Sequence, residues 1–379
     1  MKIGITCYPT YGGSGAVATE LGIQLAARGH EIHFISYAQP FRLGHFRERV
    51  FFHEVEMEDY PLFEHPPYSL ALSVAIHDTA SREGLDLVHV HYAIPHATSA
   101  WIAREMMATE KDLPIITTLH GTDITLVGLH PSFHRITQFS ILRSQGITAV
   151  SDYLKEETVR DFAVPGDRID VIPNFIDTDA WRPDLEPCHR GTLAPGGEKI
   201  VMHISNFRPV KRVEDVVAAF ARIREKVPAR LVMVGDGPDR PRAMEKGEEL
   251  GVRRDILFLG KHASVNELLA CADLFLLPSG GESFGLAALE AMACGAPVVA
   301  TRAGGLPEVV ESGRTGFLLP VGDVEGMGDA GIEILSDPAL HGRLAEAGRA
   351  RAVEYFSADR VVPMYEALYE RVIKGCEDE

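Results

Sequence analysis

Short apolar segments alternate with helix-patterned segments along most of the chain, and this alternation restricts the fold more than any other feature. A short apolar run closed by glycine, proline or polar residues is typical of a buried strand, whereas apolar residues spaced three and four apart are typical of a helix. In the first half of the 379 residues, the strand-like runs are 2–7, 31–36, 86–92, 114–119, 146–150 and 168–172, and the helix-like stretches are 14–28, 69–82, 95–107 and 152–162. This order predicts an α/β fold, with a parallel sheet covered by helices on both faces.

A second alternation follows a stretch that is rich in proline and glycine. Residues 177–198 have little periodicity and read as a connector. Beyond it, the strand-like runs are 200–205, 230–235, 256–260, 274–277 and 297–301, and the helix-like stretches are 213–226, 265–272, 283–293, 338–355 and 360–373. A chain of this length is too long for one ordinary core. We therefore expect an N-terminal Rossmann-like domain over 1–176, the connector over 177–198, a C-terminal Rossmann-like domain over 199–355, and a helical tail over 356–379 that could cross back to the first domain.

Composition excludes several classes of protein. No window of about 18 uninterrupted apolar residues suggests a membrane span, and the first residues show no signal peptide. Five widely separated cysteines without a CxxC spacing indicate neither a disulfide framework nor a zinc site, so we expect a cytoplasmic location. The formal charge of −17 argues against nucleic acid or an anionic membrane as partner, and an anionic substrate must then meet local cations. The sequence leaves the oligomeric state open, a homo-oligomer included.

Two carboxylates eight positions apart, Glu282 and Glu290, lie where the run 274–277 gives way to a predicted helix. Ligands bind at the carboxyl ends of parallel strands, and the first N–H groups of a helix attract an anion such as a diphosphate. Both carboxylates could instead be ordinary charges of a solvated helix. However, Glu290 has small and apolar neighbours, among which an unpartnered carboxylate is costly. We expect a nucleotide-sugar site here, and its predicted residues are Glu282, Ser283, Phe284, Gly285, Leu286 and Glu290.

A basic loop follows the run 200–205 at the corresponding place in the second domain. It contains Arg208, Lys211 and Arg212, and three cations suit a diphosphate. Arg212 alone also fits a solvated turn. Arg208 and Lys211 are the better candidates because Pro209 stiffens the loop between them and lowers the cost of ordering it around an anion.

A glycine-rich loop follows the first strand-like run and opens the first helix. It has a G-x-G-x-x-A pattern at Gly13, Gly15 and Ala18, which is where a dinucleotide fold holds pyrophosphate. An NAD-dependent oxidoreductase would need an acidic residue at the end of the second strand, and the chain has Ile35-Ser36-Tyr37 there. We therefore favour a phosphate or the substrate's own anionic group as the ligand of Gly13, Ser14 and Gly15.

Polar residues also follow two neighbouring strands of the first domain. Tyr92, Thr118, His120 and Asp123 come at predicted carboxyl ends, where an open α/β sheet contacts its ligand. Arg143, on a later helical stretch, is the nearest candidate for an anion-binding cation. Capping of a helix explains Asp123 equally well.

Two patterns raise the question of a metal, and neither predicts one. Five of the histidines in the first domain invite a metal hypothesis, but apart from a shared strand face for two of them their spacing is not that of a zinc site. They are His89, His91, His96, His120 and His134. Asp177-Thr178-Asp179 has the D-x-D form that holds a divalent ion in other sugar-nucleotide enzymes, but its place in the connector favours a turn.

These motifs together resemble the retaining GT-B glycosyltransferases of family GT4 over nearly the whole chain. The resemblance lies in the Glu282-to-Glu290 spacing, the Gly-Gly-Leu-Pro-Glu turn at 304–308 and the glycine loop at 12–15. It implies two Rossmann-like domains that face each other across a cleft. A closer match in the segments 12–22, 89–97, 118–125 and 205–212 implies UDP-N-acetylglucosamine as donor and the hydroxyl of L-malate as acceptor, in the first step of bacillithiol biosynthesis.

The resemblance also assigns roles to residues. It implies that Lys211 and Arg208 hold the diphosphate, that Glu290 binds the ribose hydroxyls, and that Glu282 and the amides after it bind the sugar ring. His120 would face the reacting sugar. The family's commoner loop has an arginine five positions before the lysine, where this chain has Asn206, so either Arg208 reaches the phosphate from a different angle or Asn206 faces the acceptor. The expected malate-binding residues are Ser14, Tyr92, Thr118, His120 and Arg143.

The implied reaction retains the configuration at the anomeric carbon, with Lys211, Arg208, His120 and Glu282 as the catalytic set. Fixed cations would stabilise the departing diphosphate, so we expect no essential metal and no cofactor. Three alternatives remain: a GT4 enzyme with another acceptor (an inositol phosphate, a lipid or a sugar), a UDP-sugar-binding regulator without turnover, and the NAD-dependent oxidoreductase.

Overall fold

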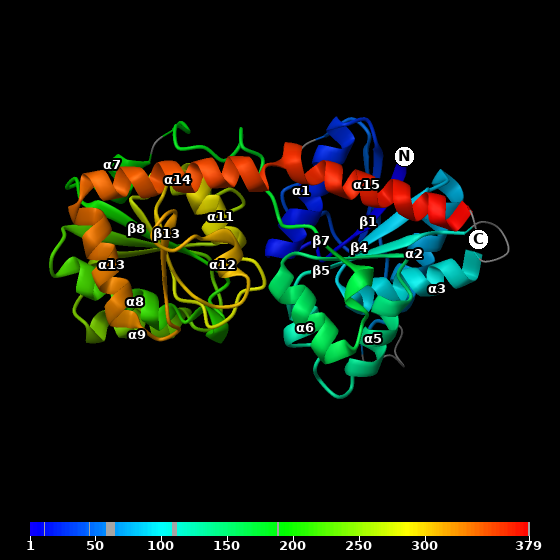
Figure 1. Ribbon diagram of the computed structural model, residues 1–379, viewed down its shortest axis with the longest axis horizontal. Helices are drawn as coiled ribbons and strands as arrows, with labels where there is room; N and C mark the ends of the chain where they lie inside the picture. The colour runs from blue at the N-terminus through cyan, green and yellow to red at the C-terminus, as the bar shows by residue number, and fades with distance from the viewer. Residues whose placement is uncertain (11, 45, 58–64, 108–111, 188, 378–379) are drawn as a thin grey trace. The chain divides into compact units, whose positions relative to one another are not determined.

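The computed structural model describes the chain except residues 11, 45, 58–64, 108–111, 188 and 378–379. It divides into two compact units, Met1–Asn174 with Val361–Glu379, and Phe175–Arg360. Each unit has one parallel β-sheet with helices packed on it (Figure 1). The predicted α/β class with two Rossmann-like domains is confirmed.

The first unit has a seven-stranded parallel sheet in the order β3-β2-β1-β4-β5-β6-β7. Its strands are β1 (Lys2–Thr6), β2 (Glu31–Ser36), β3 (Val50–Glu54), β4 (Leu87–His91), β5 (Ile115–Leu119), β6 (Gly146–Ala149) and β7 (Ile169–Val171). Its helices are α1 (Gly13–Ala27), α2 (Tyr68–Glu83), η1 (Ala93–Ala97), α3 (Thr98–Met107), α4 (Thr122–Thr125), α5 (His134–Leu142), α6 (Asp152–Phe162), η2 (Gly166–Arg168) and most of α15 (Ala358–Glu377). The central strands β4 and β5 are buried along their whole length, because helices cover both faces of the sheet.

The second unit has a six-stranded parallel sheet in the order β10-β9-β8-β11-β12-β13. Its strands are β8 (Lys199–Ile204), β9 (Ala229–Val234), β10 (Ile256–Gly260), β11 (Leu274–Leu277), β12 (Val298–Thr301) and β13 (Gly316–Leu319). Its helices are α7 (Arg190–Leu193), η3 (Pro209–Lys211), α8 (Val213–Arg224), α9 (Arg240–Glu249), η4 (Arg253–Asp255), α10 (Asn266–Leu269), α11 (Leu286–Ala293), α12 (Leu306–Val309), α13 (Val324–Ser336) and α14 (Pro338–Phe356). The predicted apolar stripe of α8, which includes Val216, Val217 and Phe220, is fully buried in the core of this unit.

The C-terminal helix α15 packs on the first unit, although α14 directly before it packs within the second. Its buried side chains recur at helical spacing, as Val361, Val362, Tyr365, Leu368, Tyr369 and Val372. Tyr369 is fully buried, and its hydroxyl lies 2.8 Å from His89 Nδ1 on β4.

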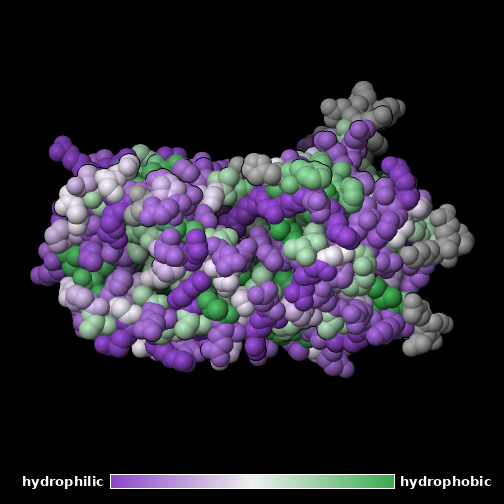
Figure 2. All heavy atoms as spheres, turned by 90° about the horizontal axis from the view of Figure 1, so that it is seen from above, coloured by the Kyte–Doolittle hydropathy of each residue, from purple (hydrophilic) through white to green (hydrophobic). Residues whose placement is uncertain are grey.

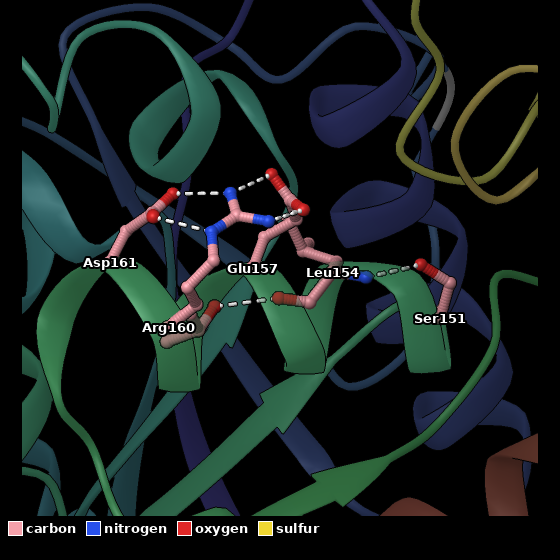
Figure 3. Close-up of polar contacts among 6 residues, drawn as sticks. Ser151, Leu154, Glu157, Arg160 and Asp161 are labelled. Carbon is pink, nitrogen blue, oxygen red and sulfur yellow. Dashed lines mark hydrogen bonds and ion pairs between the residues drawn. The ribbon is translucent and has the colours of Figure 1, made fainter.

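Helix α6 shows how local sequence signals set the limits of an element (Figure 3). Ser151 caps it, since its Oγ accepts a hydrogen bond of 3.1 Å from the Leu154 amide. Arg160 pairs with Glu157 and Asp161 at the exposed end of the helix. The helix spans the residues predicted from the sequence, 152–162.

Several elements differ from the sequence prediction. The helix expected from residue 283 begins at Leu286, because Gly285 has φ +103°, which a helix does not allow. The edge strands β3 and β13 and the helices α9 and α13 were not predicted. Hydrophilic residues cover most of the face in Figure 2, as expected when the apolar residues fill the two cores. No helix in the described part of the chain is long and apolar enough to cross a membrane.

Candidate active site

Two loops of the second unit, which follow β8 and β11, meet at the carboxyl edge of its sheet. Lys211 Nζ lies 2.5 Å from Glu282 Oε1. The same carboxylate oxygen accepts a hydrogen bond of 2.8 Å from Ser279 Oγ. The side chains of Lys211 and Glu282 are only 20% and 13% exposed, so the pair is partly shielded from water. The structure therefore brings together the lysine and the first carboxylate that the sequence singled out.

The loop after β8 is held by its neighbours in the same unit. His203 contacts the Leu276 carbonyl through Nδ1 at 2.9 Å and Ser205 Oγ through Nε2 at 2.8 Å. A carbonyl only accepts, so His203 donates from Nδ1 and accepts the Ser205 hydroxyl at Nε2. Burial lowers the pKa of His203 to about 4, which keeps this neutral arrangement. The Gly280 amide donates to the Val210 carbonyl at 2.7 Å and thereby ties this loop to the loop after β11.

Glycines allow the close approach of backbone on which the site depends. A Cβ at Gly235 would lie 1.8 Å from the Ser205 carbonyl oxygen, and a Cβ at Gly304 would lie 1.9 Å from that of Glu282. The Gly305 amide donates to the same Glu282 carbonyl at 2.8 Å. The predicted turn at 304–308 thus packs directly against the backbone of Glu282.

The remaining cations of the loop differ in accessibility. Arg208 and Asn206 are exposed, and the Arg208 carbonyl accepts a hydrogen bond of 2.8 Å from the Lys211 amide. Arg212 is engaged elsewhere, since its Nε donates to Asp215 Oδ2 at 2.7 Å. Arg208 is therefore the exposed cation beside Lys211, while Arg212 stabilises the first turn of α8.

Glu290 lies one turn into α11 and is only 5% exposed. Burial and the charge of Glu290 raise the pKa of the Cys294 thiol to about 12. The first turn of α11 holds no acidic residue, and its leading N–H groups have no acceptor within the helix. Ser283, Phe284, Gly285 and Leu286 form the approach to this turn, so an anion beside them would meet the positive end of the helix dipole.

The glycine loop of the first unit leads directly into α1, which begins at Gly13. A Cβ at Gly15 would lie 2.6 Å from the Tyr8 carbonyl oxygen, so this position requires glycine. Gly13 is exposed, Ser14 is partly exposed, and the first turn of the helix holds no acidic residue. This arrangement suits an anionic group, and the binding of one here stays a prediction.

Asp123 organises the carboxyl edge of the first sheet. Its Oδ2 accepts a hydrogen bond of 2.9 Å from the Ala93 amide, and its Oδ1 accepts bonds from the Gly121 and His120 amides at 2.9 and 3.3 Å. These bonds connect the loops after β4 and β5. They hold Tyr92, which has φ +93°, with its ring centroid 5.5 Å from that of His120.

Two of the expected acceptor residues do not join this group. Thr118 is fully buried, and its hydroxyl is engaged with His89 Nε2 and Thr148 Oγ1, both at 2.7 Å. Arg143 follows the last residue of α5, just before β6 begins. Helices run antiparallel to the strands in this fold, so Arg143 lies at the amino edge of the sheet, opposite His120.

Arg143 instead lines a cavity of about 410 Å³, together with Arg104, Arg168 and Arg371. Arg104 donates to Asp112, and Arg371 donates to Asp170. Arg168 donates to the Leu142 and Ser144 carbonyls. The Leu142 carbonyl that Arg168 contacts is at the C-terminal end of α5, which carries partial negative charge and opposes an anionic ligand.

The described residues contain no group of histidine, cysteine and carboxylate side chains arranged to hold a metal ion. The Asp177 side chain accepts a hydrogen bond of 2.9 Å from the Asp179 amide, which is the turn predicted for this D-x-D segment. Sequence reasoning missed Ser279, and it missed the contact between His91 and His120.

The parallel sheets, the cation–carboxylate pair after β8 and β11, and the supporting glycine turn define a GT-B glycosyltransferase. The solved structure of sucrose-phosphate synthase from Thermosynechococcus elongatus shares this fold, with a TM-score of 0.81, 22% identity, and coverage of 99% of this chain and 100% of that one. Anabaena HepE in complex with UDP and glucose has a TM-score of 0.80 and 21% identity, with coverage of 97% and 98%.

The chain belongs to the family 4 and group 1 glycosyltransferases. Residues 11–180 match "Glycosyltransferase Family 4", and residues 186–351 match "Glycosyl transferases group 1". The chain is 48% identical over 375 residues to the N-acetyl-alpha-D-glucosaminyl L-malate synthase of Bacillus anthracis, across 99% of this chain and 98% of that protein. It is 30% identical over 306 residues to the D-inositol 3-phosphate glycosyltransferase of Mycobacterium bovis, across 76% of this chain and 62% of that protein.

Proposed function

We propose that this glycosyltransferase moves N-acetylglucosamine from UDP-N-acetylglucosamine to the hydroxyl of L-malate, with retention at the anomeric carbon, as the first step of bacillithiol biosynthesis. The observation that carries the proposal is the 48% identity to an N-acetylglucosaminyl L-malate synthase along 99% of the chain. The Lys211–Glu282 pair at the carboxyl edge of the second sheet supports it, because both a cation and a carboxylate are available to a sugar diphosphate.

The donor would bind to the second unit. Lys211 and the exposed Arg208 would contact the diphosphate, and the first N–H groups of α11 would point at the same anion. When Lys211 turns to the phosphate, the Glu282 carboxylate becomes available to the sugar hydroxyls, while Ser279 keeps it oriented. Glu290 would accept hydrogen bonds from the ribose.

In the transfer, the bond between the anomeric carbon and the β-phosphate oxygen breaks as the malate oxygen forms a bond on the same face of the sugar. Negative charge grows on the departing UDP, where Lys211, Arg208 and the α11 amides stabilise it. The malate hydroxyl proton passes to the departing phosphate oxygen. Neither a protein base nor a metal ion is required in this scheme, since fixed cations supply the charge.

The acceptor would bind to the first unit, with its carboxylates at the α1 N-terminus near Ser14 and beside Tyr92. These residues and His120 follow strands at one edge of the sheet. We leave Thr118 and Arg143 out of the acceptor site, because the first has its hydroxyl engaged and the second lies at the opposite edge. A different acceptor is the competing hypothesis, and the relative that acts on an inositol phosphate makes that compound the one to test.

The test is mass spectrometry of products from the purified chain with UDP-N-acetylglucosamine and L-malate in the presence of EDTA. Reactions without malate, with an inositol phosphate in its place, and without EDTA are the controls. A malate-dependent glycoside together with UDP is the expected result. A glycoside of the inositol phosphate, or UDP release without a malate adduct, would overturn the malate assignment, and loss of product only in EDTA would overturn metal independence.

A further inference from the structure

The ring of His120 stacks against the ring of a second histidine, His91. His91 is the last residue of β4, and its side chain is fully buried. Its Nδ1 lies 2.8 Å from His120 Nε2, and the two rings stack with centroids 5.0 Å apart. Because β4 and β5 are neighbouring strands, this contact fixes the His120 ring at the carboxyl edge of the sheet.

The contacts around His91 and His120 leave the two rings little freedom of movement. The His89 ring lies 4.4 Å from the His91 ring, and His89 is itself bonded to Tyr369 and Thr118. The His120 main chain is held by the Asp123 carboxylate. The direction of the His120 ring is therefore set before any ligand binds, which is the condition for precise positioning at an active site.

The location of the shared proton follows from the partners of His91. Burial lowers the pKa of His120 to about 3 and that of His91 well below its ordinary value, so both rings are neutral at neutral pH. One neutral ring donates and the other accepts. His91 Nε2 is buried and has no hydrogen-bond partner among the described residues. If His91 accepted at Nδ1, its own proton would be on Nε2 as a buried N–H without an acceptor, which is unfavourable. Donation from His91 Nδ1 to His120 Nε2 avoids this, and it leaves the His120 proton on Nδ1.

We propose that His91 is a positioning residue for the sugar transfer, which holds His120 in the tautomer that presents Nδ1–H to the reacting sugar. This inference rests on the proposed function, in which His120 faces the sugar. His120 is only partly buried, and its Nδ1 has no hydrogen-bond partner in the part of the chain that the structure describes. A neutral N–H group can donate to a sugar oxygen without adding positive charge beside the anomeric carbon, where positive charge builds in the transition state.

The test compares two variants of His91 with a matched control. His91→Leu removes the hydrogen bond, whereas His91→Asn places an amide nitrogen near the position of Nδ1. His33→Leu is the control, because His33 is 1% exposed in the same sheet and its Nδ1 lies 2.9 Å from His53 Nε2 in another stacked pair. We expect His91→Leu to lower kcat about 10- to 100-fold with the KM for UDP-N-acetylglucosamine changed less than about twofold. His91→Asn should recover most of kcat, and His33→Leu should lower thermal stability while keeping kcat.

Equal kcat in His91→Leu and His33→Leu, measured where both are folded, would overturn the proposal. So would a failure of His91→Asn to recover activity although it folds. A second readout does not depend on turnover: the ¹⁵N spectrum of histidine-labelled protein, with the His120 signals assigned by their loss in His120→Asn. A His120 proton on Nδ1 that becomes mixed between the two nitrogens in His91→Leu supports the inference, and a proton on Nε2 in the unmodified chain refutes it. If the unmodified chain transfers no sugar to malate, the proposed function fails, and the spectrum still decides the tautomer.

Discussion

Lys211 Nζ and Glu282 Oε1 lie 2.5 Å apart although the two residues are separated by 71 positions in the chain. The cation expected to bind the diphosphate is thus neutralised by the carboxylate expected to bind the sugar. An incoming donor exchanges this internal pair for two new contacts, phosphate with Lys211 and sugar hydroxyl with Glu282. Both side chains are therefore kept ordered in the absence of substrate, which lowers the cost of ordering them when the donor binds.

Replacing Lys211 should have a large effect on turnover. Lys211→Ala removes a fixed positive charge from the departing diphosphate, and we expect kcat to fall about 10²- to 10³-fold. It also leaves Glu282 partly buried without its ion pair, which should lower the free energy of unfolding by about 1–3 kcal/mol. Steady-state kinetics and urea denaturation measure the two effects.

Arg212→Ala is the matched control for Lys211→Ala. Arg212 is a cation of the same loop whose guanidinium is engaged with Asp215. We expect kcat to stay within about threefold of the unmodified value, since a partly exposed ion pair within one helix turn contributes little. An equal loss of kcat in the two variants would show that the net charge of the loop matters rather than the position of Lys211.

A side chain at Gly304 should displace the Glu282 segment. The Cβ of Gly304→Ala would lie 1.9 Å from the Glu282 carbonyl oxygen, so the loop must move. We expect the affinity for UDP-N-acetylglucosamine, measured by calorimetry, to fall at least about tenfold, because a shift of about 1 Å misplaces the contacts of Glu282 with the sugar. Gly313→Ala is the control: Gly313 also has a positive φ, of +84°, but a Cβ there meets no atom within 4 Å. If the two variants bind UDP-N-acetylglucosamine equally, the close approach at Gly304 is not what positions Glu282.

The buried histidines of the first unit should make it sensitive to acid. Burial lowers the pKa of His89 and His96 to about 3 each, whereas the unfolded chain has values near 6.5. Between about pH 3 and pH 6.5 the unfolded state binds more protons than the folded state. The stability that depends on the neutral histidines is therefore fully present above about pH 6.5 and is lost as the pH falls. Each histidine contributes at most about 1.4 kcal/mol per pH unit in that window.

The fluorescence of Trp101 in urea titrations at several pH values measures this dependence once Trp181, the other of the two tryptophans, is replaced by Phe. His89→Leu should reduce the slope of stability against pH by the contribution of about one histidine. An unchanged slope would mean that His89 is not a neutral group in the folded state.

The titration of Asp123 should change the stability with pH in the opposite direction to that of the histidines. Burial raises its pKa to about 6 against an ordinary value of 3.8, so the folded state binds the extra proton in this range. Its contribution to stability is therefore largest below about pH 4 and falls as the pH rises to 6, by at most about 3 kcal/mol. Asp123→Asn removes this titration, and the stability difference between the two proteins, measured by urea denaturation between pH 4 and 7, should shift by that amount. A difference independent of pH would show that the three backbone N–H donors hold the Asp123 pKa near its ordinary value.

The sequence predicts the elements better than it predicts the contacts between them. The strand β11 has its predicted limits because four apolar residues are followed by proline and glycine. The edge strand β3 has only partly buried or exposed side chains, so it lacks the apolar run that indicates a buried strand. Glycine loops, cations and carboxylates could be placed at strand ends from spacing alone. The Lys211–Glu282 pair and the His91–His120 contact join distant segments, and no local pattern encodes either of them.

Ser14 and Arg143 lie at opposite edges of the first sheet, so we expect their substitutions to affect malate binding differently. Ser14 is partly exposed in the first turn of α1, at the edge where His120 lies, whereas Arg143 lies at the amino edge. We expect Ser14→Ala to raise the KM for malate about tenfold, as for the loss of a hydrogen bond to a charged group, with kcat changed little. Arg143→Ala should leave both constants within about twofold. Initial rates at varied malate concentration decide between them, and a raised KM in Arg143→Ala alone would mean that malate binds at the amino edge of the sheet.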